Sequence, residues 1–241
     1  MDPIVSEMTN DEQYLRFTLE NVNVSVANAI RRIILSEIPC VVFRTTPYKD
    51  NLATIDINTT RMNNELIKQR ISCIPIHIKD MDFEINDYEV VLDKENDSEE
   101  IMYATTQHLK ILHVASGKYI AEKERDVIFP KNNITGDFID IVRLRPKISD
   151  KIPGEHIKMS MRFSMGTAKE DGAFNVVSTC AYACTPDIQE IDIAWKRIEE
   201  QMRLNGKSDD DILYAEKDWR LLEAKRITKP DSFDFVIEQI G

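Results

Sequence analysis

Glycine is scarce in this sequence, and long apolar runs are missing. The 241 residues include seven glycines, and no stretch rich in glycine or proline separates two parts of the chain as a flexible linker. No apolar run reaches the roughly 18 residues that suggest a membrane-spanning helix. The first residues, MDPIVSEMTNDEQ, lack the basic and apolar regions of a signal peptide. We therefore expect a globular protein of the cytoplasm or nucleus, with one large or two small domains and no membrane partner.

Cysteine is also rare, and its spacing argues against a metal centre. Only Cys180 and Cys184 lie close together, as C-x3-C, whereas a structural zinc site usually needs two close pairs or a pair with nearby histidines. His108 and His113 have a tolerable spacing, but nothing aligns them with these cysteines. The sequence predicts no metal and no other cofactor, and reduced, mostly buried thiols.

Positive charge is in short supply. The chain has 31 lysines and arginines against 42 acidic residues, a net charge of −11. Residues 79–100 contain ten acids against Lys79 and Lys94, a local net charge of −8. Proteins that bind DNA or RNA by themselves need a basic face, so we expect no direct nucleic-acid binding. The acidic segment fits a solvent-facing region that keeps the protein soluble.

Known catalytic motifs are missing as well. The sequence has no G-x-S-x-G, no H-E-x-x-H and no G-x-x-x-x-G-K-[ST], and none of its four histidines adjoins a nucleophile. We therefore predict no catalytic residues. Because active sites assemble from distant residues, an independent hydrolase or transferase that uses Cys180 or Cys184 stays open as an alternative.

Hydrophobic periodicity predicts a mixture of strands and helices. Residues 156–166 have the clearest period of two, with inward positions at Ile157, Met159, Met161, Phe163 and Met165. Period-two or β-branched patterns also predict extended segments at 14–22, 38–46, 71–78, 173–184 and 232–241, with short strands and turns between 80 and 150. Helical spacing predicts helices over 23–38, 60–70, 190–206 and 208–226.

The chemistry of helix ends supports two of these helices. Gly206 is a plausible C-cap residue for helix 190–206, and Ser208 is a plausible N-cap for helix 208–226. Lys225 and Arg226 would lie in the last turn of the second helix, where the macrodipole favours cations. In the strand at 71–78, the alternating Ile74, Ile76 and Ile78 would share one side, and Pro75 suggests an edge position.

The helix in NVSVANAIRRIILSEIPC has two distinctive faces. At 100° per residue one face is an apolar stripe, formed by Val26, Ala29, Ile30 and Ile33, with Ile34 on its shoulder. Nearly opposite is a face made of Asn28, Arg31 and Leu35, flanked by Arg32. This second face is either an ordinary solvated surface with one stray leucine or an interface where arginine forks meet carboxylates or carbonyls of a partner.

Four collinear segments resemble a known family. NAIRRIILSEIP is similar to the signature helix of the alpha-type assembly subunits of multisubunit DNA-directed RNA polymerases. TTRMNNELIKQRISCIPI, the stretch from IDIVRLRP through PGEHIKMSMRFSMGTAKEDGAFNVVSTCAY, and SFDFVIEQIG resemble later segments of the same family in the same order. The family contains the N-terminal domain of the bacterial alpha subunit and the third-largest subunit of archaeal and eukaryotic polymerases.

The resemblance implies an α+β fold and a non-catalytic role. A discontinuous dimerisation domain would comprise residues 1–45 and 167–241, with a mostly β insertion domain at 46–166 between its parts. The resemblance implies pairing with a small eleventh-subunit-like chain and docking of the second-largest subunit, with tenth- and twelfth-subunit-like small chains joining the assembly. A free-standing regulatory adaptor with the same fold is a further alternative.

The resemblance also assigns interface residues. The dimer or core interface would contain Val26, Ile30, Ile33, Ile34, Phe233 and Phe235. The contact with the second-largest subunit would contain Asn28, Arg31, Arg32, Leu35, Glu65 and Arg70, although Glu65 and Arg70 could equally form an intramolecular ion pair.

Three departures from the family pattern limit this assignment. Residues 79–165 have no cysteine, so neither the zinc loop nor the iron–sulfur cluster of some relatives carries over. Lys169-Glu170-Asp171-Gly172 replaces a Lys-Glu-His-Ala segment, so the contact of that histidine is not assigned. The sequence stops at Gly241, where relatives continue into a long helix, so either the chain is truncated or that helix comes from elsewhere, and a cut at this point would expose apolar surface on Phe233 and Phe235. A zinc-free, divergent member suits a large DNA virus or a divergent eukaryote, and a viral member would also occur in the virion.

Overall fold

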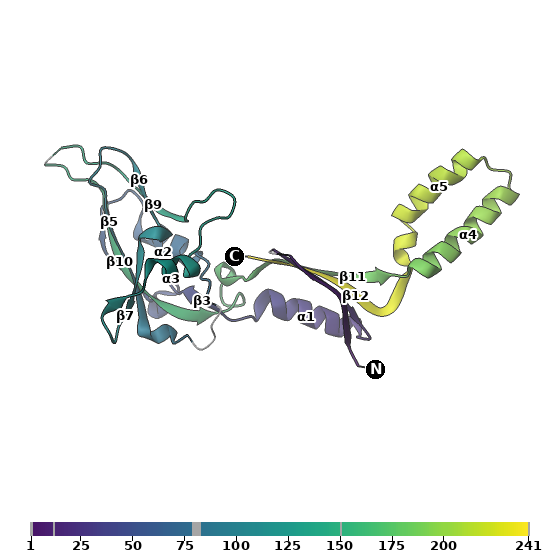
Figure 1. Ribbon diagram of the computed structural model, residues 1–241, viewed down its shortest axis with the longest axis horizontal. Helices are drawn as coiled ribbons and strands as arrows, with labels where there is room; N and C mark the ends of the chain where they lie inside the picture. Colours follow the sequence, from purple (N-terminus) through teal and green to yellow (C-terminus); the bar gives the residue numbers. More distant parts are fainter. Residues whose placement is uncertain (1, 12, 79–82, 150, 241) are drawn as a thin grey trace. The chain divides into compact units, whose positions relative to one another are not determined.

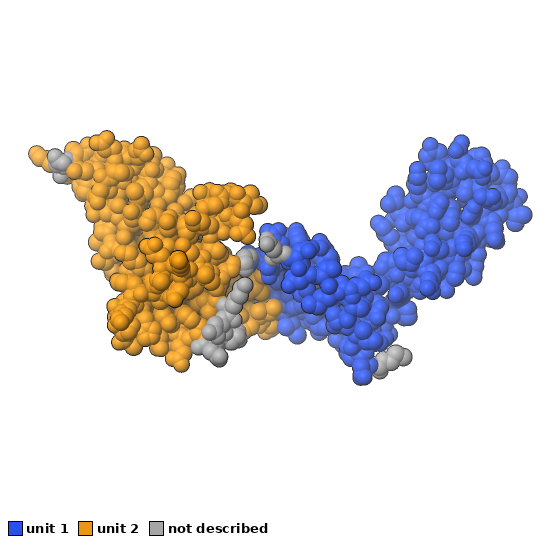
Figure 2. Space-filling model, in the orientation of Figure 1, with its two compact units in different colours: residues 1–35, 177–240 blue, residues 36–176, 241 orange. Residues whose placement is uncertain are grey.

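The computed structural model describes residues 2–11, 13–78, 83–149 and 151–240, and it divides into two compact units (Figure 2). Unit 1 comprises Met1–Leu35 and Val177–Ile240, and unit 2 comprises Ser36–Val176. The chain thus leaves unit 1, completes unit 2 and returns. The junctions fall at 35/36 and 176/177, whereas the sequence suggested 45/46 and 166/167, because residues 40–43 pair with a strand of unit 2 and Phe174 packs beside Gly166 of the same strand.

Unit 1 is an antiparallel four-stranded sheet with helices. The strand order is β1-β2-β12-β11, and α1 lies along the sheet (Figure 1). The strands are β1 (Ile4–Asn10), β2 (Tyr14–Glu20), β11 (Val177–Pro186) and β12 (Thr228–Gln239). The helices are α1 (Val24–Ser36), α4 (Ile188–Leu204), α5 (Asp209–Leu221) and a short 3-10 turn at Ala224–Arg226.

The core of unit 1 lies between α1 and the sheet. The strand register places Phe17 opposite Phe235 and Leu19 opposite Phe233, and the rings of Phe17 and Phe235 stack with centroids 5.0 Å apart. Phe233 and Phe235 are only 4% and 1% exposed. The expectation that these two rings would leave apolar surface exposed is therefore wrong, because α1 and the neighbouring strands already cover them.

The helices α4 and α5 form an antiparallel hairpin whose ends follow the chemistry of the sequence (Figure 1). Gly206 has φ +71°, and the amides of Gly206 and Lys207 donate back to Arg203 and Met202, which closes α4 in a Schellman motif. Ser208 accepts from the amide of Asp211 in a capping box, so the predicted N-cap of α5 is confirmed. The predicted extent to residue 226 is wrong, since α5 ends at Leu221.

Unit 2 consists mainly of β structure. Its larger sheet has the order β3-β10-β5-β7-β8, with β4 also pairing with β10, and its smaller sheet is β6-β9. The strands are β3 (Cys40–Phe43), β4 (Ala53–Asn58), β5 (Tyr88–Glu95), β6 (Met102–Thr105), β7 (Leu109–His113), β8 (Lys118–Tyr119), β9 (Asp140–Leu144) and β10 (His156–Gly166). Two helices, α2 (Asn64–Ser72) and α3 (Glu122–Ile128), complete the unit with 3-10 turns at Tyr48–Asp50, Ile85–Asp87, Thr106–His108 and Gly172–Phe174.

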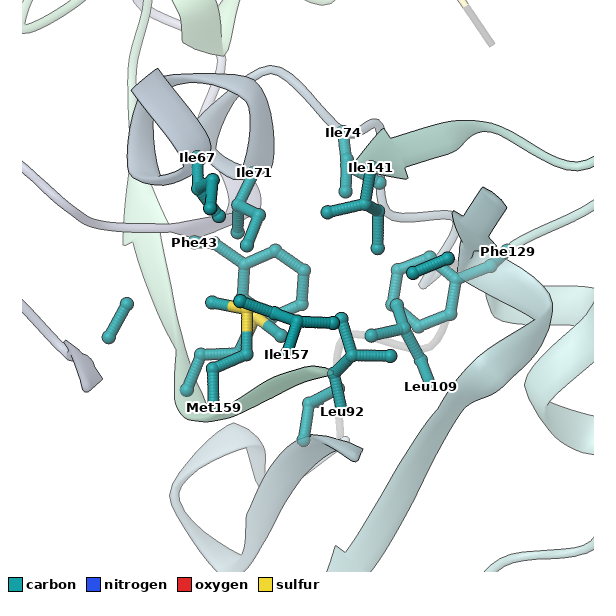
Figure 3. Close-up of a cluster of buried hydrophobic side chains, with 14 of the residues drawn as sticks. Phe43, Ile67, Ile71, Ile74, Leu92, Leu109, Phe129, Ile141, Ile157 and Met159 are labelled. Carbon is teal, nitrogen blue, oxygen red and sulfur yellow. The ribbon is translucent and has the colours of Figure 1, made fainter. Parts of the chain in front are cut away.

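The central strand β10 supplies much of the core of unit 2 (Figure 3). The predicted alternation is confirmed through Phe163, since Ile157, Met159, Met161 and Phe163 are at most 2% exposed. Met165, predicted to face inward, is instead 41% exposed. The core cluster has its last β10 member at Phe163, so no buried layer receives the side chain two residues later.

Three local predictions differ from the structure. Residues 74–78 form no strand, because Pro75 lacks an amide donor and the amide of His77 bonds to the carbonyl of Ile128 instead of to a sheet. The strand β1 and the helix α3 were not predicted.

The overall α+β class is confirmed. Among the described residues, no helix is long and apolar enough to cross a membrane.

Candidate partner-binding surfaces

The helix α1 is fixed at both ends by local chemistry. The side-chain oxygen of Asn23 accepts from the amide of Ser25 at 2.9 Å, and its carbonyl accepts from Val26 and Ala27, so Asn23 serves as the N-cap. Pro39 follows the helix after Ile38 and lacks the amide that a continued helix needs. These two signals set where α1 begins and where it ends.

Only part of the predicted apolar stripe of α1 is covered within this chain. The fully buried residue is Ala27, at 0% exposure, and Ile30 packs against the same cluster of Leu19, Phe233 and Phe235. Ile34 is half-buried. The buried side of α1 is thus centred on Ala27, whereas the sequence predicted a buried stripe that begins at Val26.

The rest of the stripe is open to solvent. Val26 is 47% exposed and Ile33 is 54% exposed, and Ala29 between them is also exposed. Their spacing of three and four residues places all three on one side of the helix. We call Val26, Ala29 and Ile33 the apolar stripe. Among the described residues of unit 1, the core cluster includes Ala27 but none of these three side chains.

The opposite side of α1 is polar and partly ordered. The guanidinium of Arg31 donates to the side-chain oxygen of Asn28 from Nε at 3.1 Å and from Nη2 at 2.8 Å. Asn28, Arg31 and Leu35 are half-buried, and Arg32 is exposed. The structure therefore brings Asn28, Arg31 and Leu35 to one side of α1, as the spacing predicted, and holds the Arg31 fork in a defined orientation.

The other two predicted contact residues, Glu65 and Arg70, lie on α2 in unit 2. They do not form the ion pair that the sequence left open as an alternative. Arg70 instead donates to two backbone carbonyls of the β9 strand, to Asp140 at 2.6 Å and to Ile141 at 2.8 Å. Glu65 is exposed. Arg70 therefore fastens α2 to β9 and borders a cleft of about 390 Å³ that also contains Cys73 and Ile139.

The segment Lys169-Glu170-Asp171, which departs from the family pattern, has structural partners within unit 2. The Lys169 ammonium lies 3.0 Å from the Glu37 carboxylate, and the Glu170 carboxylate lies 2.7 Å from the Arg44 guanidinium. Asp171 accepts from the amide of Ala173. These contacts hold the return of the chain beside the segment that follows α1 in sequence.

The cysteines do not form a reactive or metal-binding cluster among the described residues. No group of three or more His, Cys, Asp or Glu side chains has the geometry of a metal site in the part of the chain that the structure describes. The prediction that the thiols are mostly buried is wrong, because only Cys180 is buried, while Cys73 and Cys184 are exposed. Burial raises the pKa of the Cys180 thiol, although the positive charge of Arg31 opposes this rise. A raised pKa leaves less thiolate, so Cys180 is poorly suited to act as a nucleophile.

An open apolar stripe on one side of a helix and an ordered arginine on the opposite side are typical of a subunit that assembles with other chains. Comparison with known proteins agrees with this class. Residues 16–241 match the family described as the RNA polymerase Rpb3/Rpb11 dimerisation domain. The chain belongs to this family.

Individual relatives support the same conclusion. The chain is 25% identical to human DNA-directed RNA polymerases I and III subunit RPAC1 over 203 residues, which is 74% of this chain and 53% of that protein. It is 25% identical to subunit Rpo3 of Methanosphaera stadtmanae over 84% of this chain and 70% of that protein. It is 35% identical to Arabidopsis thaliana DNA-directed RNA polymerases IV and V subunit 3B over 31% of this chain and 21% of that protein. The chain thus spans about half or less of the human and Arabidopsis relatives.

Proposed function

We propose that this chain is a non-catalytic assembly subunit of a DNA-directed RNA polymerase. The observation that carries the proposal is the apolar stripe of Val26, Ala29 and Ile33, which is open on α1 of a chain that belongs to a dimerisation-domain family. Relatives of this chain are named as polymerase subunits. Unit 1 is then the dimerisation domain, and unit 2 is the insertion domain that interrupts it.

In this proposal the apolar stripe binds the partner of the heterodimer, a small eleventh-subunit-like chain. A stripe of small and branched apolar side chains on a helix suits packing against an apolar helix face of the partner. The helix α1 packs on the core of unit 1 through Ile30, which contacts the cluster that contains Phe233 and Phe235. In this proposal these three residues and Ile34 contribute to the dimer indirectly, by fixing the position of α1.

The opposite side of α1 is proposed to bind the second-largest polymerase subunit. Arg31 is already oriented by Asn28, so less side-chain entropy is lost when its fork meets a carboxylate or carbonyl of the partner. Arg32 and Leu35 extend this contact along α1. In unit 2, Glu65 and the cleft beside Arg70 are proposed as a second contact region for the same partner. Tenth- and twelfth-subunit-like small chains complete the assembly in the cytoplasm or nucleus.

The proposal is tested by co-expression with the polymerase subunits of the same source. We expect Arg31→Ala combined with Arg32→Ala to leave the heterodimer with the small chain intact and to abolish capture of the second-largest subunit. The matched control combines Lys196→Ala with Arg197→Ala, two adjacent exposed cations on α4 of the same unit. If the α1 variant still captures the second-largest subunit, Arg31 and Arg32 do not contribute to that interface. If the α4 variant loses capture equally, the effect comes from the change in net charge and not from the position of the arginines.

A further inference from the structure

A cleft in unit 2 gathers positive charge on a strongly acidic protein. Three arginines, Arg61, Arg143 and Arg145, line one cleft of about 100 Å³ together with Met62, Val142 and Glu155. The whole chain has a net charge of −11. Three guanidinium groups against the single Glu155 carboxylate give the lining a net charge of about +2, opposite in sign to the chain as a whole.

The backbone of unit 2 places Arg61 and Arg143 at the cleft. Arg61 lies in the loop between β4 and α2, where the Asn58 side chain donates to the carbonyl of Met62 at 2.8 Å and accepts from the hydroxyl of Thr60 at 2.7 Å. Arg143 lies on β9 directly opposite Tyr103, and both side chains are exposed. These hydrogen bonds of Asn58 fold the loop that carries Arg61.

The cleft already contains one carboxylate bound by one arginine. Glu155 is 6% exposed and accepts from Nε of Arg145 at 2.6 Å and from the amide of Arg145 at 2.8 Å. Unlike Arg145, the other two arginines of the cleft, Arg61 and Arg143, do not bind Glu155. Within the described residues, neither side chain has a hydrogen bond, an ion pair or a ring contact. Two guanidinium forks at the cleft are thus available to a ligand.

The size and lining of the cleft define the ligand. A volume of about 100 Å³ is well below the roughly 300 Å³ or more of sites that enclose a small molecule, so a nucleotide does not fit inside. It is several times the roughly 30 Å³ that one water occupies, so a single side-chain head group fits. The apolar walls of Met62 and Val142 suit the methylene groups that carry a side-chain carboxylate.

We propose that this cleft binds an aspartate or glutamate side chain from an acidic segment of a protein partner, through Arg61 and Arg143. The planar guanidinium fork matches a carboxylate with two parallel hydrogen bonds. The net charge of −11 disfavours a nucleic acid, because a polyanion that follows an extended track meets the average charge of the chain, whereas one carboxylate side chain meets the local positive charge of the cleft lining. The site is independent of the α1 surfaces, and it does not require that the chain belong to a polymerase.

The test uses the full chain and a fluorescent short polyglutamate peptide, with a polyglutamine peptide of equal length as the uncharged control. We expect the polyglutamate peptide to bind at low ionic strength. Arg61→Gln combined with Arg143→Gln should weaken its binding by about tenfold or more, which corresponds to losing one charge-assisted hydrogen bond. Because neither side chain has a partner among the described residues, the thermal midpoint should not change with this substitution.

Two further variants make the result specific. Arg162→Gln removes an exposed arginine of β10 in the same unit that does not line the cleft, and it should leave binding unchanged. Arg61→Lys combined with Arg143→Lys keeps both charges but loses the forks, so its binding should fall between that of the wild type and the Gln variant. Two results would overturn the proposal: binding of the peptide by the Lys variant as tight as that of the wild type, or a loss of affinity in Arg162→Gln as large as that in the Gln double variant. Either result would show that non-specific electrostatic attraction, and not the two guanidinium forks, binds the peptide. Stronger competition by inorganic phosphate or single-stranded DNA than by polyglutamate would overturn it in favour of a phosphate site.

Discussion

The apolar stripe of α1 gives the most quantitative prediction. Val26 and Ile33 are 47% and 54% exposed, so about half of each side chain remains to be buried by a partner. Complete burial of such a side chain contributes about 1.5–3 kcal/mol, so each exposed half contributes about 1 kcal/mol in the complex. Val26→Ala combined with Ile33→Ala should therefore weaken the heterodimer by about 2 kcal/mol, which is about 30-fold in Kd.

The fold itself should tolerate this double substitution. Alanine has a higher helix propensity than valine or isoleucine by a few tenths of a kcal/mol, which offsets part of the packing lost on the inner half of each side chain. The matched control is Val24→Ala, since Val24 is 51% exposed on the same helix but lies nearly opposite Ile33. Titration calorimetry with the purified small partner measures the affinities. An unchanged Kd in the double variant, or an equal loss in Val24→Ala, would refute the reasoning.

Four further substitutions test the fold and its electrostatics. Gly154→Ala should prevent stable folding, because the new Cβ would lie 1.8 Å from the backbone oxygen of Asn96, and circular dichroism would show the loss. Phe235→Ala should lower the free energy of unfolding by about 3–5 kcal/mol in urea titrations, since the ring is 1% exposed and stacks on Phe17. Ser208→Ala should cost about 1 kcal/mol of stability through loss of the α5 cap, and hydrogen exchange of the hairpin amides would report it. The hydrogen bond from His156 lowers the pKa of Asp93 below its usual 3.8, so this contact stabilises the fold above that pH and is lost as pH falls through the lowered pKa. Asp93→Asn should therefore reduce stability by less than about 1 kcal/mol at neutral pH, because Asp93 is 46% exposed, and the difference should vanish in acid.

Strand alternation and helix ends were readable from the sequence because their causes are local. Period-two alternation in β10 and the cap residues Ser208 and Gly206 each act within a few residues. The end of α5 was misplaced because residues 220–226 all favour a helix, whereas the chain must turn after Leu221 to enter β12. The strand β1 gave no signal because a bulge at Glu7, with φ +50°, interrupts its alternation.

The candidate site was predicted as a set of residues but not as a set of contacts. Periodicity identified two faces of α1, yet both faces contain large apolar or amphipathic side chains, so it could not tell which face meets the sheet. The small Ala27 decides this, because it allows close approach of α1 to Phe233 and Phe235. The hydrogen bonds by which Arg70 joins α2 to β9 could not be predicted from the sequence, because their acceptors are backbone carbonyls about 70 residues away along the chain.

The most direct test of the central claim is affinity purification of this chain from its native source, followed by mass spectrometry of the proteins recovered in near-stoichiometric amounts. We predict two very large chains together with several small ones, among them the heterodimer partner that covers Val26 and Ile33. Recovery of the chain alone, as a stable monomer, would contradict its role as a polymerase assembly subunit.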